Sequence, residues 1–271
     1  MEPCKNCQFV FEGKFCPECG QKRYRREDKS LNSLLKEAAT SFYNLDGPVL
    51  RTIKTIYSRP GKMSEDYNQG IRKRYYKPVS LYFILIVLYL LFPIAQGLNV
   101  NLDNHLMNIV AREYSANVVQ QYIDTHEISR DEFRQRFDDT SAGVSKFLLI
   151  LFIPYTVLIF KLLFPLRKFY LFDLTVAATE LNILYLSLSF LLFPLFVLIL
   201  YSTTGLILGE FIFTGIPTLL FLTWCLFFFH RFFHQPWYST LLKSLLFVIL
   251  HFLFMAMFYR FIVFQTTIWL L

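Results

Sequence analysis

The chain has 271 residues; 55% of them are hydrophobic, only 17% are charged, and phenylalanine alone occurs 31 times. A soluble protein of this length cannot bury so much apolar surface, so the composition excludes an ordinary soluble fold and favours an integral membrane protein. The formal net charge of +7 lies entirely in residues 1–78, which hold 16 Lys and Arg against 9 Asp and Glu. Because basic residues that flank a membrane segment stay in the cytoplasm, this excess predicts topology and contact with the lipid bilayer, and no nucleic-acid partner is expected.

Two pairs of cysteines near the N-terminus have the spacing of a metal site. Cys4 and Cys7 form one Cys-x-x-Cys pair, and Cys16 and Cys19 form a second pair after eight intervening residues. Four thiolates suit tetrahedral zinc and leave no open position, so we predict one structural zinc ion in a ribbon over residues 1–24. Iron is the chemical alternative, and disulfides are disfavoured in the cytoplasm. The aromatic residues that could cap the ribbon are Phe9, Phe11 and Phe15.

Residues 25–78 predict basic amphipathic helices at the cytoplasmic face of the membrane. One apolar face with helical spacing consists of Leu31, Leu34, Leu35, Ala38, Ala39 and Phe42. A second stretch has Val49, Ile53 and Ile56 as its apolar residues, with Arg51 and Lys54 between them. Such helices can lie among the lipid headgroups or pack beneath the membrane bundle, and the sequence leaves both arrangements open.

A cluster of cations stands immediately before the first long apolar run. Arg72, Lys73 and Arg74 are consecutive, and Tyr75 follows them. The plain interpretation is a basic anchor on the cytoplasmic side with an aromatic belt. The alternative is a contact site for lipid phosphate or for a protein partner.

Five apolar runs are long enough to cross the hydrocarbon core of a membrane as helices. They cover residues 79–97, 145–164, 180–201, 206–229 and 241–264. The predicted fold is therefore all-α, with about five transmembrane helices in a membrane domain over residues 79–271. Three prolines fall within these runs and can kink them, namely Pro154, Pro194 and Pro217.

The charges of the connecting loops predict the orientation. The loop over residues 98–143 carries eight acidic residues against four arginines, which places it outside. Arg167 and Lys168 place the next loop inside, and the remaining loops agree with a cytoplasmic N-terminus and an external C-terminus.

The external loop predicts a helical hairpin. Apolar residues between positions 106 and 123 indicate its first helix. Ser129 and Glu132 have the spacing of a capping box that opens the second helix, and Phe133 and Phe137 lie on one face of it.

Four polar residues in or beside the spans are candidates for chemistry. Glu180 and Glu210 are the acidic residues within the spans, and an ionisable group inside a membrane suggests function unless it reaches water or headgroups. His230 and His234 are four residues apart, the spacing of two metal ligands on one helix face, although their position at the interface favours a structural role.

Several short motifs, taken in order, resemble a known family. They are the cysteine ribbon, then Leu45-Asp46-Gly47, Arg59-Pro60-Gly61, Gly70 with Arg72, Lys73 and Tyr75, and finally Ser145-Lys146-Phe147 with Lys161 and Phe164. This order resembles the functionally uncharacterised bacterial membrane proteins grouped as "domain of unknown function 3667". The resemblance implies a multi-pass topology, a zinc ribbon and the bacterial cytoplasmic (inner) membrane, and it implies no activity.

The chain departs from the family at one stretch. The resemblance implies histidines after the second span, but Leu174, Glu180 and Asn182 occupy the matching positions. Any metal or proton chemistry of that stretch is therefore in doubt for this chain.

Three functions follow from these features. The favoured one is a non-enzymatic scaffold or regulatory protein whose ribbon recruits a cytoplasmic partner, because the metal site is closed and no catalytic arrangement is evident. The second is a small transporter or channel that uses Glu180 and Glu210. The third is a membrane-embedded enzyme that acts on lipid. The sequence leaves the oligomeric state undetermined.

Overall fold

The computed structural model describes residues 2–4, 8–19, 47–72, 74–92, 101–106, 112–165 and 169–271. The chain divides into two compact units, residues 1–50 and 51–271. The first unit contains two short strands, β1 (Glu2–Pro3) and β2 (Val10–Phe11), which pair antiparallel with Glu2 opposite Phe11. The predicted helix over residues 31–42 lies outside the described residues.

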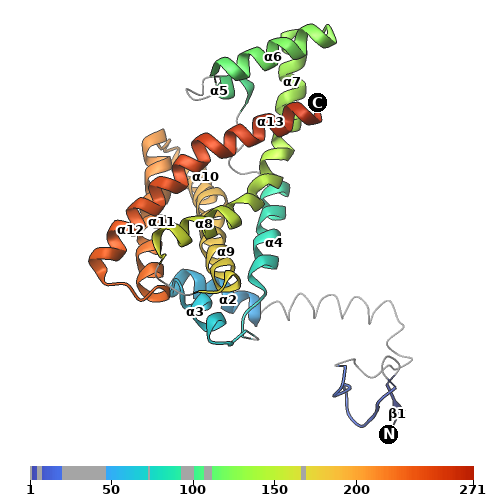
Figure 1. Cartoon of the computed structure of the whole chain (residues 1–271), viewed down its shortest axis with the longest axis vertical. Helices are drawn as coiled ribbons and strands as arrows, with labels where there is room; N and C mark the ends of the chain where they lie inside the picture. The colour runs from blue at the N-terminus through green and yellow to red at the C-terminus, as the bar shows by residue number, and fades with distance from the viewer. Residues whose placement is uncertain are drawn as a thin grey trace. The chain divides into compact units, whose positions relative to one another are not determined.

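The second unit is built from helices (Figure 1). In chain order they are α2 (Pro48–Ser58), which begins in the first unit, α3 (Lys62–Asn68), α4 (Pro78–Leu91), α5 (Leu102–Leu106), α6 (Arg112–His126), α7 (Arg130–Phe147), α8 (Phe152–Leu163), α9 (Leu171–Ser187), α10 (Phe193–Thr204), α11 (Glu210–Phe232), α12 (Trp237–Leu253) and α13 (Arg260–Leu270). The all-α prediction is confirmed.

Helix α9 lies at the centre of this unit. It packs against α3, α4, α8 and α11 (Figure 1), and almost every residue from Asp173 to Ser187 is buried. A helix that is apolar on all sides is stable only when neighbours or lipid cover every face. The helix begins at Leu171, earlier than the predicted span at 180, so Glu180 lies in its middle.

Four helical stretches among the described residues are long and apolar enough to cross a membrane. They are Arg130–Leu163, Leu171–Thr204, Phe211–Phe232 and Trp237–Leu270. The first predicted span appears as α4, which is apolar but has only 14 residues; the remainder of that span, 93–97, lies outside the described residues. Leu171–Thr204 and Trp237–Leu270 run beyond the predicted spans at both ends, and Arg130–Leu163 begins before its span because the polar helix α7 precedes it. Phe211–Phe232 begins and ends later than predicted.

Two of the internal prolines stand just after a change of helix type. A 3₁₀ turn, η3 (Leu148–Leu151), joins α7 to α8 before Pro154, and a π-helical turn, η4 (Leu188–Leu192), joins α9 to α10 before Pro194. Proline lacks an N–H and clashes with the carbonyl four residues earlier, so a tightened or widened turn accommodates it. Pro217 instead lies inside α11, which remains an α-helix.

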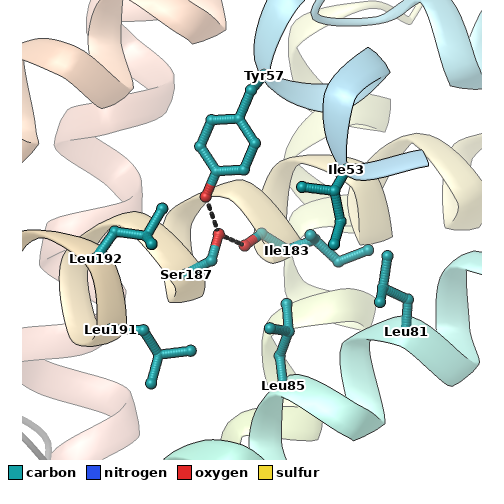
Figure 2. A pocket seen from close by; sticks show the side chains of 8 residues that line it. All are labelled: Ile53, Tyr57, Leu81, Leu85, Ile183, Ser187, Leu191 and Leu192. Carbon is teal, nitrogen blue, oxygen red and sulfur yellow. Dashed lines mark hydrogen bonds between the residues drawn. The ribbon is translucent and has the colours of Figure 1, made fainter. Parts of the chain in front are cut away.

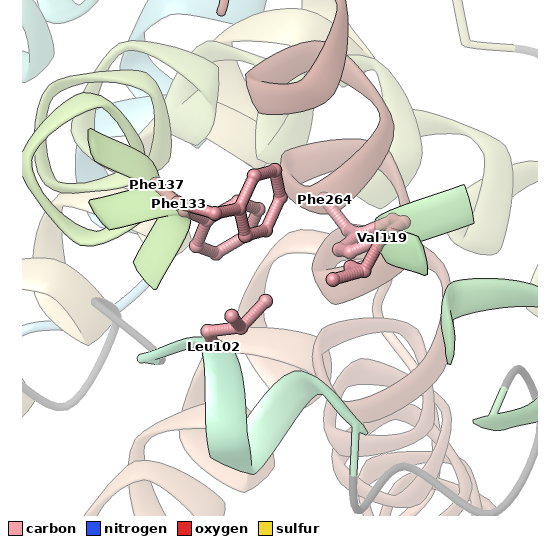
Figure 3. Packing of buried hydrophobic residues seen from close by; sticks show 5 residues of the cluster. All are labelled: Leu102, Val119, Phe133, Phe137 and Phe264. Carbon is pink, nitrogen blue, oxygen red and sulfur yellow. The ribbon is translucent and has the colours of Figure 1, made fainter. Parts of the chain in front are cut away.

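The acidic loop folds as a helical layer on the end of the C-terminal helix. Val119 of α6, Phe133 and Phe137 of α7 and Leu102 of α5 form a buried cluster with Phe264 of α13 (Figure 3). The backbone N–H of Glu132 donates to the Ser129 hydroxyl at 3.2 Å, so the predicted helix start is confirmed.

The stretch Arg130–Leu163 is longer than a membrane requires. It has 34 residues. At helical rise, a stretch of this length is about 51 Å long, whereas the hydrocarbon core of a membrane is about 30 Å thick. The polar first half of the stretch, α7, is therefore not needed to cross the hydrocarbon core, and it carries Phe133 and Phe137 of the cluster.

His105 of α5 lies buried against this cluster and should make its stability depend on pH. The centre of its ring lies 5.6 Å from the ring centre of Phe137 and 5.8 Å from that of Phe264. Burial, followed by the charge of Arg260, lowers the pKa of His105 from 6.5 to about 4. The unfolded chain therefore binds a proton first as the pH falls. The stability that the neutral His105 contributes is fully present above pH 6.5 and is lost as the pH falls from 6.5 to about 4. The loss amounts to about 3 kcal/mol at most.

The measurement is the difference in pH-dependent thermal unfolding between the native protein and the variant His105→Phe. The variant should lose this component of the fall in stability, because phenylalanine does not titrate. His126→Phe changes an exposed histidine of α6 and is the control that should keep it. Equal profiles for the native protein and His105→Phe would contradict the prediction.

Candidate functional site

Three of the four predicted metal ligands lie together in the first unit. The Sγ atoms of Cys4, Cys16 and Cys19 all lie within 4.8 Å of one another, and those of Cys4 and Cys19 are 3.5 Å apart. Cys4 follows β1, and its backbone N–H donates to the carbonyl of Phe9, so the two-stranded sheet positions it. Cys7 lies outside the described residues.

This geometry fits a metal ion. Sulfur atoms bound at about 2.3 Å to one tetrahedral zinc ion lie about 3.8 Å apart, within the range found here, whereas a disulfide bond is about 2.05 Å long. The three cysteines form no disulfide with one another, and Cys4 and Cys16 are buried with Phe11 in a small apolar cluster. Of the three aromatic residues predicted to cap the site, Phe11 belongs to this cluster, whereas Phe9 and Phe15 are 43% and 61% exposed. These cysteines could therefore hold a metal ion.

Glu180 joins α9 to the start of α3. The backbone N–H of Gly61 donates to its Oε1 atom at 2.8 Å, and the backbone N–H and hydroxyl of Ser64 both donate to Oε2, the N–H at 2.9 Å. The first N–H groups of a helix have no partner within that helix, and a buried carboxylate here satisfies two of them. Glu180 is only 1% exposed, so the interpretation that it reaches water is wrong.

One face of α11 completes this contact. Trp224 donates from Nε1 to the carbonyl of Tyr57 at 2.9 Å, and Arg231 donates to the carbonyl of Pro60 at 2.9 Å. Between them, Phe228 lies close to Gly61: a Cβ atom added to Gly61 would lie 3.0 Å from the carbonyl oxygen of Phe228. The spacing of 224, 228 and 231 is that of one helix face. This spacing was the signal in the sequence, but it did not identify the surface that it contacts.

The segment after α3 is held by a second polar network. Tyr75 is buried and donates to the Asp66 carboxylate at 2.6 Å, and Lys62 lies 3.0 Å from the same carboxylate. Burial raises the pKa of Tyr75 to about 12, with the bond to Asp66 as a further cause. Burial alone would raise the pKa of Asp66, but the bonds from Tyr75 and Lys62 outweigh it and lower that pKa. Tyr75 is thus a structural residue.

The two arginines of the predicted contact site remain on the surface. The Arg72 guanidinium lies 4.6 Å from the centre of the Phe172 ring, and that of Arg74 lies 5.8 Å from the centre of the Tyr75 ring. Lys73 lies outside the described residues.

The partners of His230 differ from those of Glu180. His230 bonds to the carbonyl of Gln235 at 2.7 Å and stacks on Trp237, with ring centres 3.9 Å apart. Helix α11 ends at Phe232, and His234 has a left-handed backbone with φ of 50°, so the two histidines do not share one helix face and that prediction is wrong. Glu210 begins α11, and its side chain lies outside the described residues. Among the described side chains, the cysteine cluster is the one group with the geometry of a metal site.

Two further positions at which the resemblance implied histidines have structural surroundings. Asn182 donates to the Thr156 hydroxyl of α8 at 3.0 Å and to the carbonyl of Ala178 at 2.8 Å. Leu174 is buried in α9. These positions therefore serve helix packing in this chain.

Of the comparisons with known proteins, one finds a match. No curated protein and no solved structure matches the chain. A family described as "Protein of unknown function (DUF3667)" matches residues 46–90, which hold α2, α3 and nearly all of α4, including Gly61 and Tyr75. The cysteines and residues 145–164 lie beyond the matched segment. The resemblance of this chain to that family of uncharacterised proteins is thereby confirmed, and it rests on the segment that Glu180 and α11 hold in place.

Proposed function

We propose that this protein is a scaffold or regulatory protein of the bacterial cytoplasmic (inner) membrane, with its N-terminus in the cytoplasm and its C-terminus outside. In this proposal, Cys4, Cys7, Cys16 and Cys19 bind one structural zinc ion, and the folded ribbon recruits a cytoplasmic protein partner. The observation that carries the proposal is the gathering of three cysteine sulfurs within 4.8 Å, two of them on buried residues.

The donor set supports zinc and a structural role. Thiolates are the ligands that structural zinc sites prefer, and metal binding supplies the folding energy of segments too short to form an apolar core. The strands β1 and β2 have only two residues each, so the sheet alone cannot hold the first unit together. The cysteines and the ion would hold this segment in one conformation, and its surface would then be available to a partner.

Replacing Cys16 and Cys19 together by serine should remove zinc from the purified protein. Native protein should contain about one zinc ion per chain and the double variant nearly none, measured by elemental analysis, because serine is a poor ligand for zinc. Membrane insertion should be unchanged, since the long apolar helices lie in the second unit. The association with cytosolic proteins, measured by cross-linking and pull-down, should be lost together with the zinc.

Cys225→Ser is the matched control. Cys225 is buried in α11, far along the chain from the cluster, and its replacement should leave the zinc content unchanged. Zinc that persists in the Cys16/Cys19 variant would overturn the assignment of the site. Partner association that persists after zinc has been lost would overturn the recruiting role.

The two other functions have weaker support. A transporter would need Glu180 to exchange protons or ions, but both of its carboxylate oxygens accept hydrogen bonds from α3 and its start. A lipid-acting enzyme would need His230 or His234 beside Glu180, and His230 instead bonds to Gln235 and stacks on Trp237.

A further inference from the structure

Arg72 lies at the start of a membrane helix. Its guanidinium is over the ring of Phe172, 4.6 Å from the ring centre. Phe172 is the second residue of Leu171–Thr204, a stretch that is long and apolar enough to cross a membrane. Helices α4 and α9 both begin beside α2 and α3 (Figure 1). Because a charged group is costly inside the hydrocarbon core, we expect this arginine at the level of the lipid headgroups.

The surface around this ring is apolar and exposed. Tyr170, Leu171 and Phe172 are 81%, 61% and 48% exposed, and Ile71 beside the arginine is 45% exposed. Exposed apolar side chains at the end of a membrane helix meet lipid, and tyrosine rings favour the headgroup level. This mixture of apolar, aromatic and cationic side chains therefore fits the boundary between the tails and the headgroups of a bilayer.

The charge of this surface is positive. Arg74 is a second exposed cation, and the segments 69–78 and 164–172 contain no acidic residue. Asp173, the next acidic residue, is buried. Within the described part of the chain, the guanidinium of Arg72 makes no ion pair, so no described carboxylate occupies its N–H groups. A guanidinium can donate from its edge to two oxygens of one phosphate group.

The segment that carries Arg72 is tied to helices α2 and α9. The Tyr76 N–H donates to the Thr52 hydroxyl of α2 at 2.8 Å. Helix α2 is bonded to α9 in turn, because the Tyr57 hydroxyl bonds to the Ser187 hydroxyl beside an apolar cavity (Figure 2). A side chain that is positioned before binding loses less conformational freedom on binding, so this support favours one ligand at one place.

We propose that this surface binds the headgroup of an anionic phospholipid. Arg72 donates to the lipid phosphate, Arg74 adds positive charge, and Tyr170 and Leu171 contact the first carbons of the acyl chains. A soluble phosphate compound would gain nothing from these exposed apolar side chains, whereas a lipid covers them. The inference goes beyond the proposed function and depends on the membrane location, not on the zinc ribbon.

The test compares lipid binding by the full chain in detergent micelles. Native mass spectrometry gives the dissociation constants of phosphatidylglycerol and of phosphatidylcholine with the same acyl chains. The native protein should bind phosphatidylglycerol more tightly than phosphatidylcholine. Arg72→Gln should weaken binding of phosphatidylglycerol about tenfold, because charge-assisted hydrogen bonds to the phosphate are lost. Arg51→Gln removes an exposed charge from α2 and is the matched control, which should leave the binding nearly unchanged.

The ring beneath the arginine is tested separately. Phe172→Leu keeps an apolar side chain but removes the ring on which the guanidinium lies, and it should weaken binding of phosphatidylglycerol about threefold. Phe172→Tyr keeps the ring and should bind like the native protein. Equal binding by the leucine and tyrosine variants would contradict the positioning role of the ring.

Three results would overturn the lipid site. Equal weakening by Arg51→Gln and Arg72→Gln would show only diffuse attraction to anionic lipid. Unchanged lipid binding in Arg72→Gln would exclude the site, also where that variant instead loses a cross-link to a cytosolic protein. Displacement of phosphatidylglycerol by an equal concentration of glycerol phosphate would assign the surface to a soluble anion. Zinc content and membrane insertion are measured independently of these results, so this failure is distinct from failure of the proposed function.

Discussion

Replacing Glu180 by alanine is expected to lower the free energy of unfolding by about 3–5 kcal/mol, the largest effect of any single substitution considered in this chain. The variant leaves the backbone N–H groups of Gly61 and Ser64 buried without their acceptor. Each such group costs about 1–3 kcal/mol. Glu180→Gln should cost less, because one amide oxygen can still accept a hydrogen bond. The measurement is denaturation of the purified protein in mixed micelles, together with limited proteolysis of residues 59–72.

Glu65→Ala is the matched control for this prediction. Glu65 lies on the same helix α3 and bonds to Lys62 at 3.1 Å, but both side chains are partly exposed to solvent. Such surface pairs contribute at most about 1 kcal/mol. Proteolysis should accelerate in Glu180→Ala and remain near the native rate in Glu65→Ala. If the two variants were equally stable, the capping role of Glu180 would be refuted.

Gly61→Ala is expected to lower the free energy of unfolding by about 2–4 kcal/mol, the second large effect. Gly61 has a left-handed backbone with φ of 81°. This conformation costs an L-residue with a side chain about 1–2 kcal/mol. In addition, the new Cβ atom would lie 3.0 Å from the backbone oxygen of Phe228, which cannot move without shifting α11. Close packing of α3 on α11 would then be lost, and the bond from Arg231 to Pro60 would weaken with it.

Gly70→Ala separates the two causes. Gly70 has φ of 86°, but a Cβ atom there would meet nothing within 4 Å. It should therefore cost only the backbone strain of about 1–2 kcal/mol. The same denaturation measurement on both variants gives the contribution of the contact with Phe228 as their difference, and a difference near zero would contradict the close packing.

Both substituted contacts involve the segment that matches the family. Residues 46–90 hold the Arg59-Pro60-Gly61 motif and Tyr75, and these residues are defined by contacts with α9 and α11 and by a local network around Asp66. Gly61 is needed because its backbone is left-handed and lies against Phe228. In this structure, the residues Pro60 and Gly61 of the motif pack α3 against α9 and α11.

Much of the fold could be predicted from residues that act locally. Ser129 begins α7 because its hydroxyl accepts from a backbone N–H three residues later, and Phe133 and Phe137 share a face because they are one helical turn apart. The two Cys-x-x-Cys pairs indicated a metal site because the two cysteines of each pair are only three positions apart. The apolar character of the long runs predicted membrane helices, but their ends differ from the prediction. For example, the polar helix α7 continues through the apolar turn η3 into α8 without a stop signal.

The sequence by itself determined the helical membrane class, the cysteine cluster, the amphipathic α2 and the helix start at Ser129, since each depends on residues a few positions apart. Only the tertiary structure decided the role of Glu180, whose partners Gly61 and Ser64 lie 119 and 116 residues away. It also decided that His230 and His234 do not act together, and that α13 supports the acidic loop through Phe264. Such contacts leave no periodic signal in the sequence, because they depend on how complete helices pack against one another.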